Sequence, residues 1–73
     1  MKINIEDIKK EMKVELISEI RDRIPGLSGV IEDIEYIDYE PSAIWIRWHD
    51  LDKSDRFDLS YSPNILDKLK SLE

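Results

Sequence analysis

The strongest constraint on the fold is a strict two-residue alternation in the stretch AIWIRWHD, residues 43–50. One side of an extended chain here carries Ile44, Ile46 and Trp48. The other side carries Ala43, Trp45, Arg47 and His49. Because successive side chains of a β-strand point to opposite faces, the stretch predicts a strand with one buried face. It places Trp48 in the core and Trp45 on the opposite face.

Two flanking segments predict further strands. GVIEDIEYIDYE is rich in β-branched and aromatic residues and predicts a strand over residues 30–38. Its alternation is imperfect, which a bulge near Asp33 or burial of parts of both faces would explain. RFDLSY, residues 56–61, predicts the third strand. EPS at 40–42 is expected to turn and DLDKSD at 50–55 to form a polar loop, and connections this short favour an antiparallel meander.

The two ends of the chain have the apolar spacing of helices. One stripe at three- and four-residue steps consists of Ile5, Ile8, Met12, Leu16, Ile20 and Ile24. This spacing predicts a helix over residues 4–24, which Pro25 ends. SPNILDKLKSLE predicts a short helix over residues 62–73, with Ser62 as its N-cap and Pro63 at its first position.

Together these elements predict an α+β fold in a single domain, residues 1–73. We expect a three-stranded antiparallel β-meander with a long N-terminal helix and a short C-terminal helix packed on one face, in the order α-β-β-β-α. A chain of this length buries only about 60% of its unfolded surface, so it has room for one core. The residues expected beneath the helices are Ile44, Ile46, Trp48, Phe57, Leu59 and Tyr61.

Composition narrows the classes of function. The net charge of −6 argues against nonspecific nucleic-acid binding, which needs a surplus of lysine and arginine. Cysteine is absent, so the chain has neither a disulfide nor a thiolate metal site. The stretch MKINIEDIKKEMK lacks an apolar signal segment, and no later run approaches the roughly 18 apolar residues of a membrane span. We therefore expect a cytoplasmic protein without membrane contact.

Catalytic and cofactor sites are not expected. His49 is the only histidine, so one chain offers no histidine pair for a metal, and the two glycines form no phosphate-binding loop. DLDKSD begins like an EF-hand loop, but Asp55 and Tyr61 stand where that loop needs glycine and glutamate. We expect no cofactor and no enzymatic activity. An acid–base enzyme that uses His49 ranks last among the alternatives.

The open face of the predicted sheet is the first candidate binding surface. Trp45 either lies flat on it, beside Tyr36 or Tyr39 with Arg47 stacked against the ring, or anchors a partner. Tryptophan, tyrosine and arginine dominate interface hot spots, and a sheet covered on one face leaves such side chains open. The candidates on this surface are Trp45, Arg47, His49 and Tyr39.

Acidic residues form the second candidate surface. On the predicted first helix, a ridge at four-residue steps consists of Asp7, Glu11, Glu15 and Glu19. A block without one basic residue holds Glu32, Asp33, Glu35, Asp38 and Glu40. Each set is either a solvated surface or the occupant of a basic groove on a partner, to which long-range attraction steers it. The candidate contacts are Glu11, Glu15, Glu19, Asp33 and Glu35.

Residues 29–61 combine a glycine that opens a strand, a tryptophan-rich middle strand and an RFDL return. In these features the stretch resembles the strand pattern of small SH3-like barrels, such as Tudor or KOW modules. Such barrels usually have five strands and bind peptides, methylated side chains or nucleic acid. The resemblance implies a binding module rather than an enzyme.

The first functional hypothesis is a small acidic protein that binds a partner with a basic surface and inhibits or regulates it without catalysis. If that surface binds nucleic acid, the chain acts as a nucleic-acid mimic, similar to anti-restriction or anti-CRISPR proteins, with no direct contact to nucleic acid itself. The second hypothesis is a homodimer whose open sheet face binds a small ligand or peptide.

Overall fold

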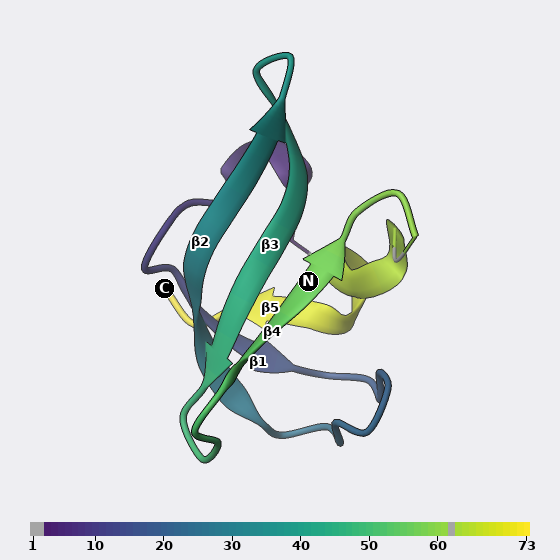
Figure 1. The fold of residues 1–73 in the computed structure, drawn as a ribbon. Helices are drawn as coiled ribbons and strands as arrows, with labels where there is room; N and C mark the ends of the chain where they lie inside the picture. Colours follow the sequence, from purple (N-terminus) through teal and green to yellow (C-terminus); the bar gives the residue numbers. More distant parts are fainter. Residues whose placement is uncertain (1–2, 62) are drawn as a thin grey trace.

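A computed structural model describes residues 3–61 and 63–73 as one antiparallel sheet of five strands, in the order β4-β3-β2-β1-β5 (Figure 1). The strands are β1 (Lys13–Leu16), β2 (Ser28–Ile37), β3 (Glu40–Trp48), β4 (Ser54–Asp58) and β5 (Leu69–Ser71). Two short 3-10 turns complete the fold, η1 (Ile5–Asp7) and η2 (Pro63–Lys68). The expected α-β-β-β-α fold is therefore wrong, and the described chain is built from strands.

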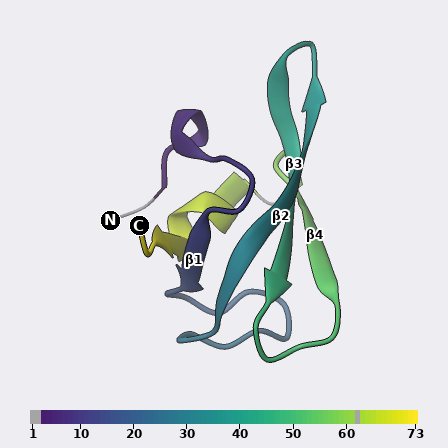
Figure 2. The ribbon, with the colours of Figure 1, turned by 90° about the vertical axis from the view of Figure 1, so that its left-hand side faces the viewer.

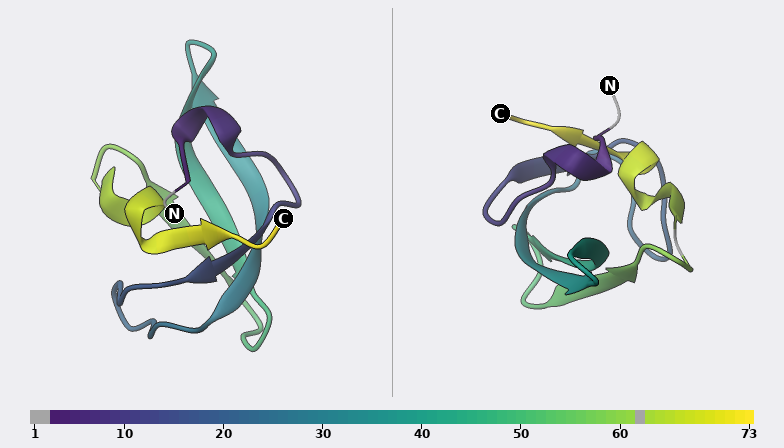
Figure 3. Two further views of the ribbon diagram at one scale, coloured as in Figure 1. Left: turned by 180° about the vertical axis from the view of Figure 1, so that it is seen from behind. Right: turned by 90° about the horizontal axis from the view of Figure 1, so that it is seen from above.

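The sheet curls strongly, so that β1, β5 and the two 3-10 turns lie across the interior from β2, β3 and β4 (Figures 2 and 3). These elements, rather than two helices, cover the inner face of the long strands. The buried apolar side chains form one contiguous cluster to which all five strands contribute. Within the described residues, no helix is long and apolar enough to cross a membrane.

The helix predicted over residues 4–24 does not form. Its first turn is η1, β1 follows, and residues 17–27 are a long connection to β2. Glu11 and Arg21 have φ values of 69° and 53°, which no right-handed helix accommodates. The apolar stripe arose because several short segments each contribute one or two side chains to the core. The segment is rich in β-branched residues, which strands favour over helices.

The helix predicted over residues 62–73 is also wrong. The chain forms η2 and then β5, which pairs with β1 through Leu69 opposite Leu16. Ser62, the predicted N-cap, lies outside the described residues, and η2 begins at Pro63. The last residues give β1 a second hydrogen-bonded neighbour, a tertiary interaction that outweighs their local helical pattern.

The three strands predicted from residues 30–61 do form, as the neighbouring antiparallel strands β2, β3 and β4. A register shift between Ile31 and Asp33 matches the expected bulge. The predicted core residues Ile44, Ile46, Trp48 and Phe57 are fully buried. Leu59 is half-buried and Tyr61 is exposed, because β4 ends at Asp58 and the chain turns away. The turn expected at 40–42 is instead at 38–39, so Pro41 lies in β3.

Candidate partner-binding surface

The two tryptophans of β3 make the same kind of contact on opposite faces of the sheet. On the inner face, the indole N–H of Trp48 donates to Asp55 Oδ2 at 2.7 Å. Arg23, from the connection 17–27, grips that carboxylate with two bonds, Nε to Oδ2 at 2.7 Å and Nη2 to Oδ1 at 3.1 Å. We call Trp48, Asp55 and Arg23 the inner triad. The hydrogen bond from Arg23 is the main reason that the pKa of Asp55 lies below its ordinary value.

Two further contacts fix the inner triad. A Cβ on Gly29 would lie 2.6 Å from the carbonyl oxygen of Arg47 and 3.0 Å from Cε3 of Trp48, so the indole packs where only glycine leaves room. Arg21 places its guanidinium carbon 4.5 Å from the centroid of the Phe57 ring, a cation–π contact. The connection 17–27 is thus held against the long strands by both of its arginines.

On the outer face, the indole N–H of Trp45 donates to Glu35 Oε2 at 2.7 Å. Arg56 grips Glu35 with two bonds, Nε to Oε2 at 2.8 Å and Nη2 to Oε1 at 3.0 Å. These three residues form the outer triad. The hydrogen bonds from Arg56 and then from Trp45 lower the pKa of Glu35 to about 2.

The prediction that Trp45 and Trp48 face opposite ways is confirmed. Trp45 is half-buried on the outer face, but the tyrosines expected beside it are elsewhere: its cross-strand neighbours are Asp33 and Arg56. Arg47, expected to stack on the ring, forms an ion pair with Glu32 at 3.7 Å. The indole N–H of Trp45 already donates to an acceptor within the chain. Only the apolar surface of its ring is therefore open to contact with a partner.

His49 is exposed at the end of β3, and its Nδ1 lies 3.2 Å from the hydroxyl oxygen of Ser28. This serine–histidine pair escaped sequence analysis because the two residues are distant along the chain. Nucleophilic catalysis needs a third group that orients the histidine. In the described part of the chain, the structure records no carboxylate on His49, and the pair reads as a cross-strand contact.

The acidic ridge expected on a first helix does not exist, since that helix does not form. Asp7 lies in η1, Glu11 in the turn before β1, Glu15 in β1 and Glu19 in the connection after β1. Glu15 pairs with Lys70 at 3.6 Å. These carboxylates therefore belong to separate segments rather than to one continuous surface.

The second acidic block divides into two parts. Its first three members are paired with cations: Glu32 with Arg47, Asp33 with Lys10 at 3.9 Å, and Glu35 with Arg56. Of the remaining two, Asp38 lies in the turn of the β2–β3 hairpin and Glu40 directly follows it, and the described residues give them no ion pair. Uncompensated negative charge therefore collects at this turn.

The β2–β3 hairpin extends beyond the rest of the molecule (Figure 1). Three large side chains near its end are exposed, Tyr36 at 58%, Ile37 at 66% and Tyr39 at 99%. We call them the hairpin patch. Sequence analysis named Tyr39 as a contact and placed Tyr36 or Tyr39 beside Trp45, and it did not name Ile37.

The backbone of the hairpin turn is unfavourable for its residues. Asp38 and Tyr39 have φ values of 51° and 70°, the pair of positive angles that a type I′ turn requires. Aspartate tolerates this conformation and glycine prefers it, but for other residues it costs about 1–2 kcal/mol. Tyr39 makes no compensating contact, since it is almost fully exposed. Glu11 and Arg21 also have positive φ values, and Tyr39 differs from them in its large exposed ring at the end of a hairpin.

A groove lies beside the turn end of the hairpin, between the hairpin, η1 and the chain that follows β4. Its volume is about 430 Å³, and it is lined by Ile5, Ile37, Pro41 and Leu59, with Asp38 and Glu40 among its polar residues. We call it the hairpin groove. It joins the hairpin patch through Ile37.

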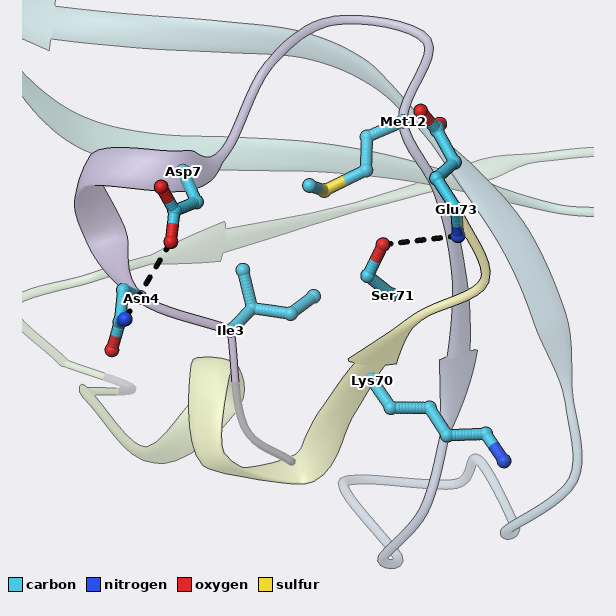
Figure 4. Close-up of a pocket in the computed structure, with 7 residues that line it drawn as sticks. All are labelled: Ile3, Asn4, Asp7, Met12, Lys70, Ser71 and Glu73. Carbon is cyan, nitrogen blue, oxygen red and sulfur yellow. Dashed lines mark hydrogen bonds between the residues drawn. The ribbon is translucent and has the colours of Figure 1, made fainter.

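A second cavity of about 350 Å³ lies between η1 and the C-terminal strand, over Ile3 and Met12 (Figure 4). Its polar side chains are engaged within the chain. Glu73 accepts a bond from the Lys13 amide at 2.8 Å, and Lys70 points away from the cavity toward its partner Glu15. This cavity is therefore less suited to a ligand than the hairpin groove.

Among the described residues, no group of three or more histidine, aspartate or glutamate side chains is placed to hold a metal ion. Comparison with protein-family models, with curated proteins and with solved structures finds no match to this chain.

Proposed function

We propose that this chain is a small, non-catalytic protein-binding factor that inserts its β2–β3 hairpin into a basic site of a partner protein. The observation that carries the proposal is Tyr39, an exposed tyrosine held in a left-handed turn. Glycine or asparagine at this position would favour folding. The Tyr39 side chain contributes nothing to the core, so we expect its role to be contact with another molecule.

The hairpin patch has the composition of an interface centre. Tyrosine is among the residues that contribute most to binding when a partner buries them, and Tyr36, Ile37 and Tyr39 lie within four consecutive positions. Arg47 and His49 are exposed at the opposite end of β3 from this patch, so they lie outside the proposed contact.

The charge of the chain supports a basic partner. A net charge of −6 accelerates encounter with a positive surface, and Asp38 and Glu40 add carboxylates beside the hairpin patch that no cation of residues 3–61 or 63–73 pairs. If the basic surface is the nucleic-acid site of the partner, binding blocks it, in the manner of an anti-restriction or anti-CRISPR protein. A cytoplasmic location is part of this proposal, and fractionation of the source cells tests it.

The five-stranded curled sheet favours a binding module over an enzyme. Five strands is the number usual in the SH3-like barrels that residues 29–61 resemble, and we propose this kinship as part of the functional assignment. Small barrels of this kind act through surface contacts, in agreement with the exposed hairpin patch.

The test is capture of partners from a lysate of the source organism, at low and high salt, followed by mass spectrometry. We expect a basic protein that binds wild type and is released as salt rises, because screening weakens steering and surface ion pairs. Tyr39→Gly should lose it. Tyr61→Ser, which removes another exposed tyrosine outside the hairpin, should retain it.

Two results would contradict the proposal. One is a partner that binds Tyr39→Gly as well as wild type. The other is a tight dimer in light scattering at micromolar concentration that persists in Tyr39→Gly, which would favour a homodimer formed through the sheet face.

A further inference from the structure

We infer that the hairpin groove receives an extended, basic segment of the partner, which inserts an aliphatic side chain between Ile5 and Ile37 and sets a lysine or arginine against Asp38 and Glu40. The inference rests on the proposed function and adds the chemistry of the bound segment. The groove includes Ile5 of η1 and Leu59 and Ser60, which follow β4. None of these residues belongs to the hairpin patch.

The apolar part of the lining of the hairpin groove comes from three separate parts of the chain, and Asp38, Glu40, Ser42 and Ser60 supply the polar part. Ile5 belongs to η1, Ile37 and Pro41 to the hairpin, and Leu59 to the turn after β4. Ile5 and Ile37 are both exposed, whereas Leu59 packs partly against the core. The groove thus has a fixed floor and two aliphatic walls that a partner side chain would remove from water.

The volume of the groove suits side chains rather than a folded element. Clefts that hold small ligands measure about 300–1,000 Å³, and the hairpin groove, at about 430 Å³, lies near the lower end of that range. An extended segment fits such a site because every second side chain of it points the same way. An aliphatic residue can then enter the groove, while the adjacent lysine or arginine, which starts on the opposite face, bends its long side chain back to the acidic rim.

The rim determines the charge of the occupant. The carboxylates of Glu32, Asp33 and Glu35, elsewhere on the same hairpin, are each matched by a lysine or arginine of this chain. Asp38 and Glu40 line the groove without such a match among the described residues. Both carboxylates are exposed, so they are open to a lysine or arginine of a bound molecule. A symmetric contact with a second copy would bring four of these carboxylates together, so a basic partner fits and a second copy does not.

The experiment is an NMR titration of the 15N-labelled full chain with synthetic peptides. The probe is a short peptide in which lysine alternates with leucine, and the matched peptides replace either the lysines by glutamate or the leucines by serine. We expect saturable shifts of the amides of Ile5, Ile37, Leu59 and Ser60 with the lysine–leucine peptide, reduced by salt. Both matched peptides should bind at least about tenfold more weakly. The glutamate peptide lacks the cation for the acidic rim, and the serine peptide lacks the aliphatic side chain for the groove.

Variants of the chain distinguish binding in the hairpin groove from nonspecific attraction between a basic peptide and an acidic protein. Asp38→Asn combined with Glu40→Gln removes the rim charge, and asparagine keeps the left-handed turn. Ile37→Ser removes an exposed wall. Both should weaken peptide binding at least about tenfold, whereas Glu19→Gln, an exposed acid of the connection 17–27, should not change it. Wild-type affinity in the groove variants, equal binding of the lysine–serine peptide, or shifts spread over other acidic surfaces would overturn the inference.

Failure of this inference differs from failure of the proposed function. Groove variants that capture the partner like wild type would remove the groove and leave the hairpin as the contact. A peptide that still binds the groove in Tyr39→Gly, while Tyr39→Gly also retains the partner, would keep the groove and remove Tyr39 as the anchor. Amide broadening at the groove that grows with protein concentration, without peptide, would assign the groove to a second copy and overturn the inference.

Discussion

The inner and outer triads contain the same three chemical groups and differ in their exposure to water. The side chains of Arg23 and Asp55 are 17% and 12% exposed, whereas those of Arg56 and Glu35 are 41% and 39% exposed. The inner pair has little water to replace a lost partner, and the outer pair has ample water. The same constellation therefore holds the fold together on one face and orders side chains on the other.

The difference in exposure also determines which triad can change without loss of folding. Trp48 is fully buried and its contacts join β3, β4 and the connection 17–27, so any change there acts on folding. Trp45, Glu35 and Arg56 join β3, β2 and β4 on the outer face, where water solvates whatever partner a substitution leaves unpaired. The charges of Glu32 and Glu35 on this face are already paired within the chain.

The largest expected contrast comes from removal of each indole. Trp48→Ala should lower the free energy of unfolding by about 3–5 kcal/mol, because it leaves a cavity in the core. Trp45→Ala should lower it by about 1 kcal/mol, since the ring is half-buried. Urea denaturation followed by circular dichroism measures both. Equal losses in the two variants would break the distinction between the faces.

Neutralising each carboxylate tests the electrostatic half of the comparison. Asp55→Asn should lower the free energy of unfolding by about 2–3 kcal/mol, because Arg23 loses an ionised partner in a site with little water. Glu35→Gln should shift the melting temperature less, because water solvates Arg56 once its partner is gone. Thermal melts at neutral pH decide the order. A larger shift in Glu35→Gln would contradict it.

The pH dependence of stability tests the contribution of Glu35 in the outer triad. The pKa of Glu35 falls from its ordinary 4.5 to about 2 on folding, and that of Asp55 falls below 3.8. Both carboxylates thus favour the folded state above their unfolded pKa values, and this contribution is lost as acid protonates them. Wild type should lose stability between about pH 5 and pH 2. In Glu35→Gln, urea titrations should show a shallower loss over this interval; an unchanged slope would show that Glu35 does not contribute.

The smallest expected effect lies at the hairpin turn, beyond the outer triad. Tyr39→Gly should raise the free energy of unfolding by less than about 1 kcal/mol, because relief of the left-handed strain exceeds the entropic cost of glycine. Tyr39→Ala keeps a Cβ and should show no gain. Urea denaturation of the two variants beside wild type measures the difference, and destabilisation by glycine would show that Tyr39 supports the fold.

Strands with a local signal could be predicted from the sequence. The alternation around Ile44, Ile46 and Trp48 is set by neighbouring residues, and it correctly separated the two tryptophans. The strand β1 was missed because it has only four residues, although Val14 and Leu16 alternate with exposed or half-exposed neighbours. Its existence depends on pairing with β2 and β5, which no local pattern reports.

The candidate site was predictable only in part. Tyr39 was predicted as a neighbour of Trp45 on the open sheet face, but Asp38–Tyr39 lacks the glycine typical of a type I′ turn, so the turn was placed at 40–42 instead of 38–39. The two triads join residues such as Arg23 and Asp55 that are 32 positions apart. Pairings over such distances follow from the curled sheet and carry no signal in composition or spacing.

The most direct test of the account compares stability and partner affinity in a single variant. Tyr39→Gly should melt at or above the temperature of wild type and bind the captured partner at least about tenfold more weakly. An unchanged affinity, or a fall in affinity that accompanies a fall in melting temperature, would contradict the claim that Tyr39 is retained for binding at the expense of folding.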